Sequence, residues 1–181
     1  MKLRNNKFII GIIVLCFLLV GCGKKDVDIV NTSNTKGKLS DNPSSNINVN
    51  GSGTLECSRA ANVSDGLEAS FRIVVTYKNG NMLVLHSIDT IKSDNQDSLT
   101  EYENAYNKIS EQYKDIKYYD TTVTRDDNSV MFDLNINYEK VDIDKIIEIE
   151  GDDAKMFKDG KAKLKPWLTY AKKFGTTCEG V

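Results

Sequence analysis

Alternation of apolar and polar residues predicts a first β-hairpin in this chain. Positions 67–77 alternate between apolar and mostly polar side chains, which is the period of a strand with one buried face. The Asn79-Gly80 pair that follows favours a tight turn, because both residues accept positive φ. The returning strand is expected at about 82–92, and a further strand is expected before the hairpin, at about 54–63.

A second hairpin is predicted downstream. Its first strand covers 117–125, its turn is Asp126-Asp127-Asn128, and its second strand covers 130–138. In that second strand the even positions are apolar and the odd positions are mostly polar. One dry face and one wet face are typical of an antiparallel sheet that is covered on one side. The two hairpins and the first strand give about five antiparallel strands.

Between the hairpins, a helix is predicted over 99–113. Its apolar residues recur every three or four positions, which makes one stripe of the helix apolar. Asp97 or Ser98 is expected to cap its start, and Glu101, three residues after Ser98, would complete a capping box.

Two shorter helices are expected after the last predicted strand. The first covers 142–150 and ends at Gly151; the second covers 166–174, with Pro166 in its first turn and Gly175 as its stop. The expected order of elements is βββ-α-ββ-α-α. This order predicts an α+β fold: a two-layer sandwich with an antiparallel sheet of about five strands and the helices on one face.

The N-terminus has the pattern of an export signal. Residues 1–7 hold the positive charges Lys2, Arg4 and Lys7, and positions 8–20 form a 13-residue apolar run. A helix needs about 20 apolar residues to span a membrane, so this run is too short for a stable span and has the length of a secretory signal core. We therefore expect the protein to be exported.

The apolar run ends in Leu19-Val20-Gly21-Cys22, which resembles the lipobox of bacterial lipoproteins. The resemblance implies that residues 1–21 are a signal peptide that is cut off and that the Cys22 thiol carries a diacylglycerol. The mature chain would then be anchored on the outer face of the bacterial cytoplasmic membrane or on another envelope membrane. Two acyl chains give stable anchoring where one gives only marginal binding. The alternative is an uncleaved signal anchor in which Cys22 is incidental.

Composition changes after the lipobox. Residues 22–53 are rich in Asn, Ser, Gly, Lys and Asp and show no sustained period, so they cannot bury enough apolar surface to offset their ordering entropy. We expect a lipidated cysteine and a flexible tether of roughly 30 residues, which would hold the domain on the order of 30 Å from the bilayer. Residues 54–181 have the apolar share and the length of a single ordinary domain.

The remaining cysteines predict a disulfide. Cys16 lies in the signal segment, and once Cys22 carries lipid, Cys57 and Cys178 are the only pair left. Export would place this pair in an oxidising compartment, where disulfides form and persist. The bridge would close a loop of about 120 residues and contribute about 4–5 kcal/mol in the chain-entropy model.

The charge is unevenly distributed. The chain has a net charge of −2, which excludes a strongly basic nucleic-acid binder, yet segment 155–173 combines seven lysines with one acid, Asp159. The lysines could form a contact surface for anionic lipid headgroups or an acidic partner, or they could be a solvated face above aromatic residues of the core. We favour the second interpretation, because aromatic residues at helical spacing are usually buried. The seven residues are Lys155, Lys158, Lys161, Lys163, Lys165, Lys172 and Lys173.

The sequence holds no motif of catalysis or cofactor binding. It contains no Gly-x-Ser-x-Gly, His-Glu-x-x-His, phosphate-binding loop or dinucleotide fingerprint. Its single histidine, His86, is expected to be a structural or surface residue. Acidic clusters at 94–97, 126–127 and 152–153 lack the spacing of an EF-hand and are expected to serve turns. We predict no catalytic residue, no metal and no cofactor, and therefore no enzyme.

Several short motifs lie in the predicted domain: Tyr77-Lys78-Asn79-Gly80, Gln112-Tyr113-Lys114-Asp115-Ile116, Asn137-Tyr138 followed by Val141-Asp142, and Phe174-Gly175. Together with the lipobox and the tether, they resemble the YehR-like bacterial lipoproteins, a family of unknown function. The resemblance covers about 54–178 and implies a two-layer α/β sandwich with no established reaction. Cys57 and Cys178 depart from the pattern of the enteric members and suggest a separate branch.

The expected function is that of a lipid-anchored extracytoplasmic accessory or ligand-binding lipoprotein of the bacterial cell envelope. Its partners would be the membrane, through Cys22, and an envelope protein or a small ligand. Two alternatives remain open: an interaction module at the membrane surface, and an enzyme whose site is assembled from dispersed carboxylate, Tyr and Lys residues. A deep pocket with converging carboxylates would favour the enzyme, and an exposed apolar patch would favour the interaction module.

Overall fold

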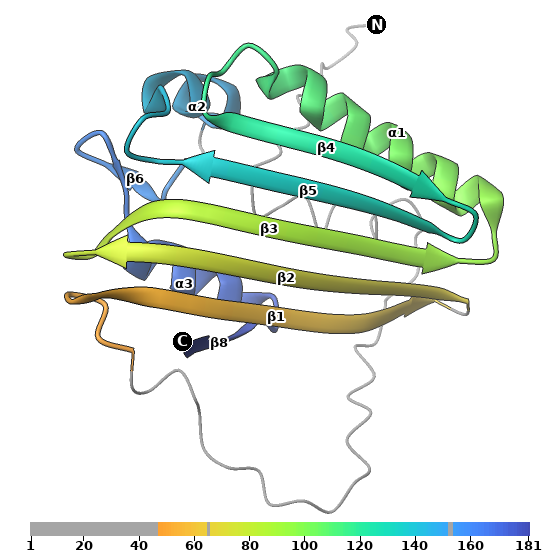
Figure 1. Cartoon of the computed structure of the whole chain (residues 1–181), viewed down its shortest axis with the longest axis horizontal. Helices are drawn as coiled ribbons and strands as arrows, with labels where there is room; N and C mark the ends of the chain where they lie inside the picture. Colours follow the sequence, from red (N-terminus) through yellow and green to blue (C-terminus); the bar gives the residue numbers. More distant parts are fainter. Residues whose placement is uncertain (1–46, 65, 152–153) are drawn as a thin grey trace, which may run out of the picture.

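The computed structural model describes residues 47–64, 66–151 and 154–181 of the chain (Figure 1). The expected signal peptide, the expected lipidation residue Cys22 and the expected tether up to residue 46 lie outside the described residues. Within the described part of the chain, no helix is long and apolar enough to cross a membrane.

Six antiparallel strands form the main sheet, in the order β4-β5-β3-β2-β1-β8 (Figure 1). The first hairpin turns where the sequence predicts, because Asn79 and Gly80 both adopt positive φ, 51° and 76°. Pairing is antiparallel between all neighbours, so each strand alternates between a core-facing and an outward-facing residue. The strands are β1 (Ser52–Ser64), β2 (Leu67–Lys78), β3 (Asn81–Ser93), β4 (Tyr119–Asp126), β5 (Ser129–Asn137) and β8 (Thr177–Gly180).

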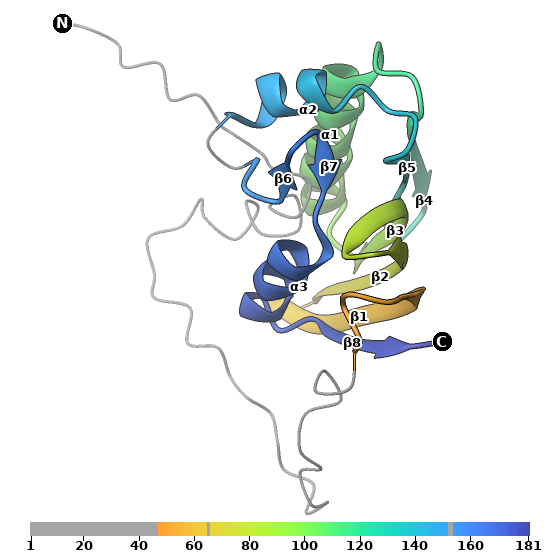
Figure 2. The same cartoon turned by 90° about the vertical axis from the view of Figure 1, so that its left-hand side faces the viewer.

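Three helices lie on one face of this sheet (Figure 2). The first, α1 (Gln96–Tyr113), contacts β3, β4 and β5, whereas α3 (Leu164–Lys173) lies over β1 and β2. The short α2 (Ile143–Glu150) lies beside the end of α1. The predicted α+β fold, a two-layer sandwich with helices on one face, is therefore confirmed. The predicted apolar stripe of α1 is buried and consists of Leu99, Tyr102, Tyr106, Ile109 and Tyr113.

Three short strands were not predicted from the sequence. A separate hairpin is formed by β6 (Phe157–Lys158) and β7 (Lys161–Ala162), and β8 adds a sixth strand to the sheet. Two-residue strands are too short for a period to appear. The four residues of β8 pair only with Leu55–Ser58 of β1, so their position depends on a contact distant in sequence.

The start of α1 differs from the prediction. Its N-cap is Asn95, whose Oδ1 accepts hydrogen bonds from the backbone N–H groups of Asp97 at 2.9 Å and Ser98 at 3.1 Å. Asp97 and Ser98, which were predicted as caps, therefore do not cap the helix; their backbone N–H groups donate to the cap residue Asn95. The helix starts at Gln96, three residues before the predicted residue 99, because Asn95 has the extended backbone (φ −85°, ψ 109°) and the capping side chain that an N-cap needs.

One hydrophobic core joins the sheet to the helices and includes residues from Leu55 to Cys178. Tyr106 of α1 stacks on Phe132 of β5, with ring centroids 4.9 Å apart. Trp167 of α3 is fully buried (0% exposed). The described residues therefore share one hydrophobic core.

Candidate functional site

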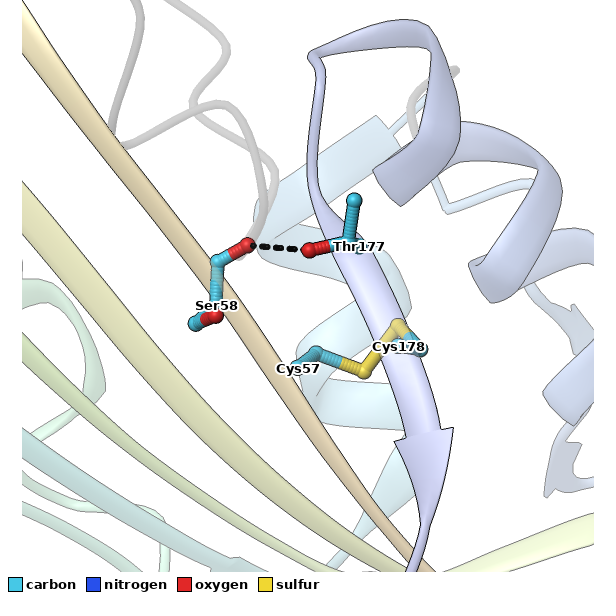
Figure 3. Close-up of a disulfide and its surroundings, with 4 residues drawn as sticks. All are labelled: Cys57, Ser58, Thr177 and Cys178. Atoms are coloured by element: carbon cyan, nitrogen blue, oxygen red, sulfur yellow. Dashed lines mark hydrogen bonds between the residues drawn. A yellow bond between two sulfur atoms is a disulfide. The ribbon is translucent and has the colours of Figure 1, made fainter. Parts of the chain in front are cut away.

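The predicted disulfide links the two strands at one edge of the sheet (Figure 3). Cys57 of β1 and Cys178 of β8 are direct cross-strand partners, with Cα atoms 4.0 Å apart, and their sulfur atoms are bonded. Both side chains are buried, and Thr177 Oγ1 donates a hydrogen bond to the Ser58 carbonyl at 3.4 Å. The bond therefore fixes the C-terminal strand to the first strand of the fold.

The lysine-rich segment 155–173 has buried apolar side chains and solvent-exposed lysines. Met156 and Trp167 are buried, as expected for core residues. Lys163 is half-buried, and its Nζ donates a hydrogen bond to Asn81 Oδ1 at 2.9 Å, which ties the start of α3 to the β2–β3 turn. Six of the seven candidate lysines are exposed to solvent: Lys155, Lys158, Lys161, Lys165, Lys172 and Lys173.

The β6–β7 hairpin carries two of these lysines at opposed positions. Lys158 and Lys161 are direct cross-strand partners, and the turn between them, Asp159-Gly160, has positive φ at both residues, 54° and 64°. Two like charges directly opposite each other destabilise a strand pair. The hairpin therefore concentrates positive charge at the expense of its own stability.

The N-terminus of α3 adds to this positive potential. The N-terminal end of a helix carries a partial positive charge, which acidic residues or a polar cap normally compensate. The first turn of α3 has no acidic residue, Lys163 at the N-cap position makes no side-chain cap hydrogen bond, and Lys165 lies in the turn itself. The arrangement favours an anionic neighbour.

A buried carboxylate, Glu150, lies among three buried tyrosines. Glu150 ends α2 and is 1% exposed. Tyr113 and Tyr119 stack with centroids 4.3 Å apart. Burial raises the pKa of both hydroxyls and that of Tyr138, and the nearby charge of Glu150 raises the pKa of all three further. These phenols therefore stay protonated well into the alkaline range and cannot act as bases near neutral pH.

A second buried carboxylate lies on the core-facing side of β3. Asp89 is 3% exposed and accepts a hydrogen bond from Ser87 Oγ at 2.9 Å. In the same cross-strand row, Phe71 of β2 is followed by Arg59 of β1, whose guanidinium carbon lies 5.9 Å from the Phe71 ring centroid. A buried charge requires polar partners. This row therefore places a carboxylate, an aromatic ring and a guanidinium side by side on the sheet face that the helices cover.

His86 lies on the face of the sheet opposite to the helices. Its Nε2 is 3.0 Å from Asp133 Oδ1 of β5, and both side chains are partly exposed. This position matches the structural or surface role expected from the sequence. Among the described residues, no group of three or more His, Cys, Asp and Glu side chains is arranged to hold a metal ion.

An open, shallow pocket lies at the β4–β5 turn, where Arg125 Nη2 donates to Gln96 Oε1 at 2.6 Å. Gln96 Nε2 in turn donates to the carbonyl of Asp127 at 2.7 Å. These side chains bond to one another across the pocket, so they serve to hold the turn against the start of α1. The lining residues are Gln96, Arg125, Asp126, Asp127 and Asn128.

Comparison with known proteins gives two similar solved structures. One is the YehR protein of E. coli, determined by NMR, with 21% sequence identity and a TM-score of 0.48; the similarity covers 68% of this chain and 88% of that one. The other is a protein from Streptococcus pneumoniae TIGR4, also determined by NMR, with 10% identity and a TM-score of 0.43, covering 69% of this chain and 84% of that one. No protein-family model and no curated protein matches the chain. We draw no functional argument from likenesses of this degree.

Neither buried carboxylate was predicted from the sequence, although each has a periodic signal. In α2, Ile143, Ile146 and Glu150 share one helical stripe, and all three are buried. In β3, Asp89 has the same parity as the buried Leu85 and Ile91. Following the period through the polar residues would have placed both carboxylates in the interior.

Proposed function

We propose that this chain is a lipid-anchored extracytoplasmic lipoprotein of the bacterial cell envelope, with an accessory or ligand-binding role. The observation that carries the proposal is Leu19-Val20-Gly21-Cys22 at the end of a 13-residue apolar run that follows three positive charges. The thiol of Cys22 would take the diacylglycerol, and residues 1–21 would be removed. Two acyl chains suffice for stable anchoring.

The disulfide supports this placement. Disulfides persist in oxidising compartments outside the cytoplasm and are rare inside it. Cys57 and Cys178 are bonded and buried in the described fold. The cell-surface location would allow this bond, and an envelope protein or a small ligand is the proposed further partner. We propose no reaction for the domain.

Metabolic labelling with a palmitate analogue tests the anchor. Wild-type protein should incorporate the label, and its mature form should begin at Cys22. Cys22→Ser should lose the label, because only a thiol can form the thioether to the lipid. Cys16→Ser is the matched control: it removes a cysteine six residues earlier, inside the apolar run, and should be labelled like wild type. Undiminished labelling of Cys22→Ser, or a mature wild-type chain that still contains residues 1–21, would contradict the proposal.

A further inference from the structure

The chain enters the described fold beside the lysine-rich segment. The Gly51 carbonyl, directly before β1, accepts a hydrogen bond from the Asn79 N–H in the β2–β3 turn at 2.7 Å. The Gly80 carbonyl of the same turn accepts from the Leu164 N–H, the first residue of α3, at 3.0 Å. Figure 1 shows the start of β1, the β2–β3 turn and β6 at the same end of the sheet.

Four exposed lysines lie at this end of the molecule. Lys158 and Lys161 oppose each other on the β6–β7 hairpin, Lys165 lies in the first turn of α3, and Lys78 ends β2 next to the turn. All four side chains are exposed. We refer to Lys78, Lys158, Lys161 and Lys165 as the basic end. Asp159 lies in the turn between the two hairpin lysines, and exposed Glu139 and Asp142 follow β5 at the same end of the sheet.

Four exposed aspartates lie at the opposite end of the sheet, together with Lys92 and Arg125. Asp94 and Asp97 follow the end of β3, and Asp126 and Asp127 form the β4–β5 turn; all four are exposed. The two loops meet, because the Ser93 N–H donates to the Asn128 carbonyl at 3.0 Å. The strands between the two ends are 12 or 13 residues long, which corresponds to about 40 Å. The lysine cluster therefore lies at the end of the sheet where the chain enters.

We propose that the basic end is a contact surface for anionic phospholipid headgroups. The proposal rests on the proposed function, which places a bilayer at the far end of the segment that leads into Gly51. The expected tether of roughly 30 residues would allow an average separation on the order of 30 Å, so the entry point would be the part of the domain that meets the surface most often. The negative headgroups would attract the four lysines of the basic end.

The local energetics agree with this occupant. The opposed pair Lys158 and Lys161 is unfavourable in the domain alone, and the first turn of α3 has no acidic residue. A phosphate group beside the hairpin would reduce the repulsion between the two lysines. The buried positions of Met156 and Trp167 show that the aromatic part of the segment serves the core, so the contact is electrostatic, without insertion into the bilayer.

The expected affinity of the basic end for an anionic surface is low. Each lysine near an anionic surface contributes about fivefold in binding, equivalent to about 1 kcal/mol. Four lysines therefore give only weak binding to the unanchored chain. A tether raises the effective concentration of the domain at the surface, so a weak contact suffices to orient an anchored domain.

Vesicle co-sedimentation of the mature chain tests the contact. The chain from residue 22, with Cys22→Ser, keeps every described residue and has no lipid. It should bind vesicles that contain phosphatidylglycerol and should not bind vesicles of phosphatidylcholine alone. The double variant Lys158→Gln/Lys161→Gln should weaken binding about 25-fold. The matched control Lys92→Gln/Lys108→Gln removes the same charge from exposed positions at the far end of β3 and on α1 and should change binding less than twofold.

The outcomes are distinguishable. Equal binding to both vesicles, or an equal loss in the two double variants, overturns the basic end as a lipid contact. Thermal unfolding of each variant checks that the fold is intact; exposed lysines on the hairpin should leave the midpoint unchanged or raise it. The vesicle assay uses unlipidated chain, so it does not depend on Cys22. An absence of lipid on wild-type Cys22 would therefore overturn the proposed function without changing the vesicle result.

Discussion

At the scale of single residues, the unusual chemistry of this protein is in its interior. Tyr138 is buried, and its hydroxyl makes no hydrogen bond within the described part of the chain. Its pKa, like those of Tyr113 and Tyr119, is raised by burial and by nearby charges that include Glu150. The native state therefore keeps three phenols protonated at a pH where an unfolded chain releases these protons.

Stability should consequently fall steeply above about pH 10. Below pH 10 a tyrosine is protonated in both states and has no effect on the pH dependence. Above pH 10, the unfolded state binds fewer protons than the native state, so the free energy of unfolding decreases as the pH rises. The decrease is about 1.4 kcal/mol per pH unit for each such tyrosine, or about 4 kcal/mol per pH unit for the three together.

Substituting Tyr138→Phe should reduce this alkaline slope by about a third. At neutral pH the change in stability should be within about 1 kcal/mol, because the lost hydroxyl has no hydrogen-bond partner among the described residues. Urea unfolding followed by circular dichroism, at a series of pH values on both sides of 10, measures both quantities. An unchanged slope would show that Tyr138 ionises as readily in the native state as in the unfolded chain.

Residues of this kind mark the limit of sequence analysis. The Cys57–Cys178 pairing was predictable because elimination leaves two cysteines in the domain. The positions of Glu150 and Asp89 were accessible in principle, because each continues an apolar period. The tyrosines near Glu150, and the cross-strand row in which Phe71 lies between Asp89 and Arg59, were not predictable, because they depend on where α2 packs and on strand order.

At the scale of elements, the long periodic segments were predicted and the short ones were not. A period can emerge in the longer elements, which are β1, β2, β3, β5 and α1. The β6–β7 hairpin and β8 depend on tertiary contacts instead: β7 meets β3, and β8 meets β1 beside the disulfide. A four-residue edge strand gains little from its own ladder, so we attribute its position mainly to the covalent bond.

The start of α1 provides a direct test of helix capping. Asn95→Ala should lower the free energy of unfolding by about 1 kcal/mol, because the N–H groups of Asp97 and Ser98 lose their acceptor. Ser98→Ala is the matched control and should have a smaller effect, because Ser98 contributes its backbone N–H, which alanine retains. Chemical denaturation of both variants measures the difference. A larger loss for Ser98→Ala would restore the cap that the sequence pattern predicted.

At the scale of the whole molecule, the net charge does not show where the charged residues lie on the surface. The chain has a net charge of −2, which indicates no preference for an anionic or a cationic partner. The fold places a cluster of four exposed lysines where the chain enters and a cluster of four exposed aspartates about 40 Å away. The lysine-rich segment is visible in the sequence. Its position beside the chain entry could not be predicted, because it requires the contact between the β2–β3 turn and α3.

This separation predicts a preferred orientation of the anchored protein. In vesicles that contain phosphatidylglycerol, the basic end should face the surface, and Lys158 and Lys161 should be acetylated more slowly by an amine-reactive reagent than in phosphatidylcholine vesicles. Lys92, near the opposite end of β3, should react equally in both. Peptide mass spectrometry quantifies each lysine in one experiment, so Lys92 serves as an internal control.

Salt provides the decisive contrast for this orientation. The screening length shortens from about 10 Å at 0.1 M ionic strength to about 3 Å at 1 M, whereas two acyl chains hold the protein through the hydrophobic effect. High salt should therefore abolish the protection of Lys158 and Lys161 while the protein remains bound to the vesicles. Protection that persists at high salt would mean that the hairpin is covered by a protein contact or by an apolar contact with the bilayer. Protection that is absent at low salt would mean that the anchored domain has no preferred orientation.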